Sequence, residues 1–151
     1  MRARSDRADP GASESGSGSG RETELGGYRN ALEHLRAGRH DEAVLGLRTF
    51  VKKFPGHDYA DNAQYWLGEC FYDRKRYAEA ASEFRAAVAN YPLGNKAPDA
   101  LLKLGYCLLA MGEQSKGRDA LRQVPEAYPR TEAARLASER LAELGHMEGT
   151  Q

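Results

Sequence analysis

The chain has 151 residues, the length of one domain of ordinary size. Its 22 basic and 22 acidic residues cancel, which argues against nucleic-acid or anionic-membrane binding, because such binding needs a basic excess. No apolar run approaches the roughly 20 residues of a membrane span. Two cysteines cannot form a disulfide framework, so the fold must depend on a hydrophobic core.

Residues 1–23 have the composition of a flexible linker, with Ser, Gly, Asp and Arg dominant and Gly and Ser alternating up to Gly20. Such a segment buries too little apolar surface to offset the entropy lost on ordering. We therefore predict a disordered linker over residues 1–23. The stretch also lacks the apolar segment of a signal peptide. We expect either a fragment or a chain whose start lies downstream of a longer gene product's start.

The rest of the chain contains an internal repeat. Aromatic–proline pairs recur at a constant interval of 37 residues, at Phe54-Pro55, Tyr91-Pro92 and Tyr128-Pro129. The same shift aligns small residues, namely Ala31 with Gly68 and Gly105, and Ala43 with Ala80 and Gly117. Units this short cannot bury a core alone, so neighbouring units must stack.

Within each unit the apolar residues recur at helical steps of three and four. This pattern predicts an all-α, right-handed solenoid in residues 24–145, made of three helix–turn–helix units followed by one capping helix. The expected bounds of the units are about 24–60, 61–97 and 98–134, with the capping helix over 131–144. Residues 146–151 are expected to be a disordered tail.

Several residues mark the expected helix ends. Asp58 is a candidate N-cap of the second unit. Gly38 and Gly112 stand where first helices must stop, and glycine suits a left-handed cap there. Pro125 falls inside the last helix of the third unit and is expected to kink it, or to end it a turn early.

The second unit resembles a tetratricopeptide repeat, since it carries that repeat's signature residues at the repeat's intervals: Leu67-Gly68, Phe71, Ala80, Phe84, Ala87 and Pro92. The stretches ADNAQYWLGECFYDRKRYAEAASEF and YPLGNKAPDALLKLGYCLLAMGE resemble, more specifically, the C-terminal domain of the CpoB (YbgF) family. This family consists of periplasmic Tol-Pal-associated proteins that coordinate outer-membrane constriction with septal wall synthesis.

The resemblance implies a non-enzymatic, periplasmic scaffold with protein partners, TolA and a bifunctional penicillin-binding synthase. CpoB-like proteins carry a signal sequence and a trimerising coiled coil before their repeats, and this chain retains only something linker-like. The alternative is a structural subunit of an outer-membrane assembly or secretion complex resembling BamD. Such a subunit would normally have a lipobox cysteine near its start and about five units.

No residue pattern indicates catalysis, a metal site or a cofactor. Neither the HExxH metal motif nor GxSxG, Walker or dinucleotide fingerprints occur. Cys70 and Cys107 occupy equivalent positions of adjacent units and are expected to be small buried thiols. A disulfide between them is the less favoured alternative, because neighbouring helices lie ~8–10 Å apart.

In tetratricopeptide repeats the first helices of successive units line a concave groove. The resemblance places twelve residues of this chain on that face: Tyr28, Leu32, Leu35, Asn62, Tyr65, Glu69, Tyr72, Asp73, Asp99, Leu102, Tyr106 and Leu109. Tyrosine offers a large contact area with little entropy to lose, which is typical of binding surfaces. Glu69, Asp73 and Asp99 would favour a basic ligand. The alternative is that the tyrosines pack between helices.

Overall fold

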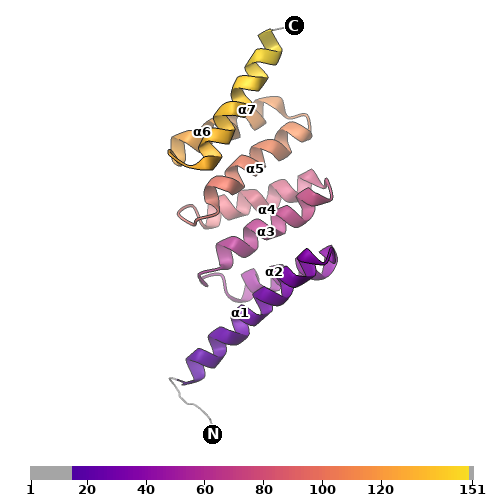
Figure 1. Cartoon of the computed structure of the whole chain (residues 1–151), viewed down its shortest axis with the longest axis vertical. Coiled ribbons are helices and arrows are strands. Elements are labelled where there is room, and N and C mark those ends of the chain that lie inside the picture. Colours follow the sequence, from indigo (N-terminus) through magenta and orange to yellow (C-terminus); the bar gives the residue numbers. More distant parts are fainter. Residues whose placement is uncertain (1–14, 150–151) are drawn as a thin grey trace. The chain divides into compact units, whose positions relative to one another are not determined.

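The computed structural model describes residues 15–149, which form seven helices and no strand (Figure 1). Two compact units divide the chain after His57. In the first unit, α1 (Ser15–Arg36) packs on α2 (His40–Lys53) as a helical hairpin. The second unit contains five helices, which are α3 (Ala60–Asp73), α4 (Tyr77–Asn90), α5 (Ala97–Ala110), α6 (Gln114–Ala127) and α7 (Glu132–Gly149).

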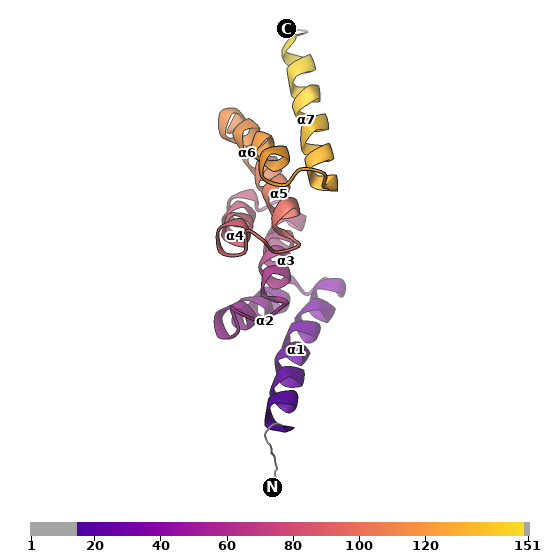
Figure 2. The ribbon, with the colours of Figure 1, turned by 90° about the vertical axis from the view of Figure 1, so that its left-hand side faces the viewer.

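In the second unit each helix packs on the next one along the chain, and α5 also contacts α3 and α7. Figure 2 shows α4 and α6 on one side of this unit, α3 and α5 beside them, and α7 on the opposite side from α4. The largest fully buried side chains here include Leu67, Phe84 and Leu121, from α3, α4 and α6. The first helices of the two pairs, α3 and α5, therefore form one layer, as the periodicity predicts.

Small residues stand where paired helices cross. A Cβ added at Gly68 would lie 2.6 Å from Cδ1 of Phe84, and one at Gly105 would lie 2.7 Å from Cδ2 of Leu121. In the first unit, a Cβ at Gly46 would lie 2.8 Å from that of Ala31. These separations are shorter than van der Waals contact, so the backbones approach this closely only because the side chains are absent.

The turn inside each helix pair has the same capping geometry. Gly38 and Gly112 adopt φ values of +79° and +83°, which confirms the predicted left-handed caps. In the third pair, Gly112 N donates to the Leu109 carbonyl and Glu113 N to the Leu108 carbonyl, each at 2.9 Å. In the second pair Lys75, midway in sequence between the two glycines, takes the left-handed position with φ +61°.

Replacing Lys75 with glycine is expected to stabilise the second unit. A residue with a Cβ is strained by ~1–2 kcal/mol in the left-handed region, whereas glycine adopts it freely. Glycine also gains entropy in the unfolded chain, so we expect a net increase of up to ~1 kcal/mol in unfolding free energy. Urea unfolding followed by circular dichroism measures it. The reverse change, Gly112→Lys, should lower stability, and a destabilised Lys75→Gly variant would contradict the assignment.

Two expectations about helix ends are wrong. Asp58 is not the N-cap of α3, because the helix begins at Ala60 and Tyr59 stands at the cap without a side-chain capping bond. Pro125 does not shorten α6, which continues to Ala127. A proline in the last turn removes only one backbone donor, and the helix still closes with Tyr128 N donating to the Val124 carbonyl at 2.8 Å.

The outer ends of the first and last helices differ from the expected boundaries. The backbone from Ser15 to residue 23, assigned to the linker by composition, belongs to α1. Likewise α7 continues to Gly149, past the expected end of the capping helix and into the expected tail. The remaining parts of the predicted linker and tail, residues 1–14 and 150–151, lie outside the described residues.

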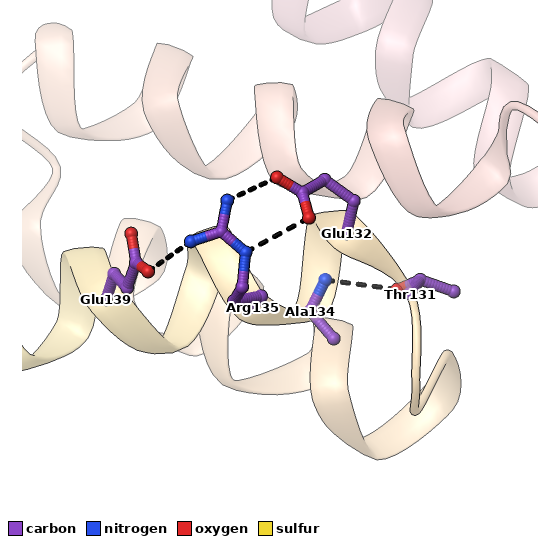
Figure 3. A network of polar contacts seen from close by, with 5 residues as sticks. All are labelled: Thr131, Glu132, Ala134, Arg135 and Glu139. Carbon is purple, nitrogen blue, oxygen red and sulfur yellow. Dashed lines mark hydrogen bonds and ion pairs between the residues drawn. The ribbon is translucent and has the colours of Figure 1, made fainter.

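The start of α7 is defined by its own polar side chains (Figure 3). The Thr131 hydroxyl accepts a hydrogen bond from Ala134 N at 3.0 Å and so caps the helix. Arg135 donates through Nε to Glu132 Oε1 at 3.0 Å and also contacts Glu139 on the next turn. These ion pairs are exposed and stabilise little, so the cap is what sets the beginning of α7.

Candidate functional site

One face of α3 presents Tyr65, Glu69 and Tyr72, because steps of four and three residues return to the same side of a helix. The Tyr65 hydroxyl donates to Glu69 Oε2 at 3.2 Å. Its ring packs against Phe84 with a centroid separation of 5.5 Å, and the side chain is only 7% exposed. Tyr65 is thus mostly core, and its polar end orients the Glu69 carboxylate.

Lys103 of α5 neutralises that carboxylate. Its Nζ lies 3.0 Å from Glu69 Oε1 and 3.4 Å from Oε2. The same ammonium stands 4.3 Å from the centroid of the Tyr72 ring, a cation–π geometry. The charge on this face is therefore balanced by a lysine that sequence reasoning missed. Helical spacing could have indicated Lys103, since it lies four residues after Asp99 and three before Tyr106.

A cleft of about 690 Å³ opens beside this pair of helices, over the C-terminal ends of α3 and α5. Three tyrosines line it, and α7 supplies four of the other side chains. The lining residues are Tyr72, Tyr77, Tyr106, Leu109, Ala110, Gln114, Arg140, Glu143, Leu144 and Met147. Of the predicted groove residues, the structure brings Tyr72, Tyr106 and Leu109 together here.

The contribution of α7 to the cleft is the main feature that sequence reasoning missed. The Arg140 guanidinium lies 5.5 Å from the Tyr106 ring centroid and 4.0 Å from Glu143. Met147 is largely exposed at the cleft. The sequence predicted only a cap here, and the spacing of Arg140, Glu143 and Met147 along one side of the helix was the one available signal.

The tyrosines of this face hold their protons strongly. Burial raises the pKa of Tyr65, and the neighbouring Glu69 carboxylate raises it further. Burial also raises the pKa of Tyr72 and of Tyr106, the latter partly offset by Arg140. All three therefore present neutral phenols at physiological pH, able to donate a hydrogen bond.

The other predicted residues of the second unit lie apart from the cleft. Asn62 and Asp99 stand near the N-terminal ends of α3 and α5 and are half-buried, and the Asn62 Oδ1 atom is buried without a hydrogen-bond partner. Asp73 is exposed at the end of α3. Leu102 is 4% exposed and belongs to the core.

In the first unit, Tyr28 is buried and packs on Phe50 with ring centroids 5.4 Å apart. Leu32 and Leu35 on the same helix are half-buried. Tyr28 thus follows the packing interpretation, while the two leucines retain accessible surface.

The cysteines are buried free thiols, as the favoured interpretation predicts. Burial raises the pKa of Cys70 to about 11 and that of Cys107 to about 12. Such thiols are poor nucleophiles and poor metal ligands at neutral pH. Among residues 15–149, no cluster of three His, Cys, Asp or Glu side chains could hold a metal ion.

The comparisons with known proteins agree with this architecture. Tetratricopeptide-repeat family models match residues 28–95 and residues 99–131. This chain therefore belongs to the tetratricopeptide-repeat family, and its predicted fold class, an all-α repeat solenoid, is confirmed. Members of this family bind protein partners and act as interaction scaffolds. None of the described helices has the length and apolar character of a membrane span.

Solved structures of low sequence identity share the fold. The first repeat domain of Spaghetti (RPAP3), bound to the HSP90 peptide SRMEEVD, superposes with a TM-score of 0.67 at 17% identity, covering 85% of this chain and 97% of that one. The Arabidopsis OM64 repeat domain gives 0.64 at 14% identity, over 81% and 96%.

The cell division coordinator CpoB of Pseudomonas putida is 40% identical to this chain over 42 residues. This match spans 28% of the chain and 16% of the length of CpoB. The sequence resemblance to CpoB is thereby supported for part of the repeat region.

Proposed function

We propose that this protein binds a segment of a partner protein on the face formed by α3, α5 and α7, as a CpoB-like, non-enzymatic scaffold. In this proposal it works in the periplasm and links the Tol-Pal system to septal wall synthesis. Its partners are a TolA-like protein and a bifunctional penicillin-binding synthase. The observation that carries the binding site is the tyrosine-lined cleft, and the match to CpoB supports the cellular role.

Within this site the residues have different roles. Tyr106 and Tyr72 are half-buried, so their rings keep accessible area for a partner, and Leu109 forms part of the apolar wall. Tyr65 and Glu69 support the face from below. Asn62, Asp73 and Asp99 would contact the flanking parts of a bound segment. Because Lys103 already neutralises Glu69, the face favours an uncharged anchor more than a basic one.

Truncating Tyr106 to alanine is expected to weaken binding at least tenfold, because an aromatic anchor at an interface centre contributes ~2 kcal/mol or more. The full chain is titrated calorimetrically with the periplasmic part of a TolA protein. Tyr65→Ala should weaken binding to a similar extent, partly through lost packing. Glu69→Ala should weaken it less, and mainly at low salt.

Tyr59→Ala is the matched control, since Tyr59 is 40% exposed and lies outside the cleft. It should bind like the parent. Circular dichroism must show that every variant keeps its helices. If folded Tyr106→Ala binds TolA as tightly as the parent, the cleft is not the binding site. If the parent itself does not bind, the CpoB-like role is wrong.

A further inference from the structure

A second groove lies on the other side of the second unit, between the outer helices α4 and α6. Both helices pack on α5 rather than on each other, and they stand on the same side of it (Figure 2). The space between them measures about 400 Å³. No residue of this groove belongs to the tyrosine-lined cleft, so the two are separate surfaces.

Each of the three helices contributes one face to this groove at helical spacing. The floor is apolar and comes from α5, with Leu101, Leu104 and Leu108 at steps of three and four. Val88 extends the apolar surface up the α4 wall. Ala89 and Ala120 face the groove from the two walls, and these short side chains leave the floor accessible.

The rims of the groove are cationic on both sides. Arg85 stands on the α4 wall and Lys116 on the α6 wall. The one carboxylate of the lining, Asp119, is engaged by Arg122 at 2.8 Å. Lys116 pairs with Glu113 at 3.3 Å, but both side chains are exposed, so this pair is weak and yields to a partner's carboxylate.

We propose that the α4–α6 groove binds an amphipathic helix of a partner protein whose apolar stripe is flanked on both sides by Asp or Glu. The apolar stripe would lie on the leucine floor, as in other helix-in-groove complexes. A helix in this position turns one flank toward each wall, so acidic residues on both flanks meet Arg85 and Lys116. The charge of the rims therefore selects the acidic helix over a basic one.

The test uses the full chain and two synthetic peptides of about four helical turns. Both peptides carry leucines at i, i+3 and i+7, and the flanking positions are glutamate in one and lysine in the other. The glutamate peptide should bind at least tenfold more tightly by calorimetry. Its amide chemical-shift changes should map to α4, α5 and α6 around Val88 and Leu104.

Two variants challenge the assignment. Arg85→Glu combined with Lys116→Glu should weaken binding of the glutamate peptide at least tenfold and improve binding of the lysine peptide. Ala89→Trp should weaken both by filling the groove. The matched control, Arg29→Glu with Lys52→Glu, makes the same change of net charge at exposed positions of the first unit and should bind like the parent.

Equal affinity for the two peptides, or parent-like binding by both groove variants, would overturn the proposal. Shift changes confined to Tyr72 and Tyr106 would also overturn it, because the peptide would then occupy the cleft. Concentration-dependent dimerisation that Ala89→Trp abolishes, without peptide binding, would assign the groove to a second copy of this chain instead. The Ala89→Trp variant should still bind TolA, so this test is independent of the proposed function.

Discussion

Replacing Gly68 with leucine is expected to destabilise the second unit severely. The new side chain would enter the space that the Phe84 ring occupies, where even a Cβ overlaps ring atoms. Phe84 is fully buried and cannot swing into solvent. Relief requires α3 and α4 to separate, which removes the packing of both. Overpacking of a tight core typically destabilises by ~1–3 kcal/mol, and a forced helix separation adds to that.

Ala80→Leu should have the same effect, since Ala80 is fully buried at the same crossing. The thermal midpoint by far-UV circular dichroism measures both variants. The matched control is Ala78→Leu on the same helix, where the side chain is exposed, and its effect should stay within ~0.5 kcal/mol. Parent-like midpoints for both Gly68→Leu and Ala80→Leu would show that this crossing is not tightly packed.

Raising the pH above about 9 is expected to weaken the fold steeply, and the two cysteines should account for part of the loss. The ordinary pKa of a cysteine thiol is 9.0, and burial raises it to about 11 for Cys70 and about 12 for Cys107. A folded-state pKa above the unfolded one means that the unfolded chain releases protons first. The stabilisation is therefore complete below about pH 9 and is lost as pH rises toward those folded values.

Urea unfolding between neutral pH and about pH 11 measures this loss. Tyrosines with raised pKa values contribute in the same direction, so the comparison with a variant is decisive. The double variant Cys70→Ala/Cys107→Ala should lose less stability over this range than the parent, although it starts lower at neutral pH because of the small cavities. An identical pH dependence in the two proteins would show that the buried thiols do not contribute.

The fold and the general position of the binding face could be predicted because they depend on local and periodic features. The 37-residue interval sets the number of helix pairs, and steps of three and four set which residues share a helix face. Gly38 and Gly112 mark turns by their own conformational freedom. The interval also places Lys75 at the third such turn, although the lack of a glycine there concealed it.

Contacts between residues distant in sequence were decided only by the tertiary structure. Lys103 reaches Glu69 across 34 residues and changes the charge of the face from acidic to balanced. Tyr65 and Leu102 have the spacing of groove residues, yet their surroundings bury them.

The sequence by itself therefore determined the repeat, the helices and the side of each helix that carries tyrosines, because these follow from backbone periodicity and residue size. The tertiary structure alone decided which of those tyrosines remain accessible, and which cation faces which carboxylate. It also decided that α7 completes a cleft while α4 and α6 leave a groove between them. Those outcomes depend on how closely separate helices approach, which is set by the side chains at every crossing together.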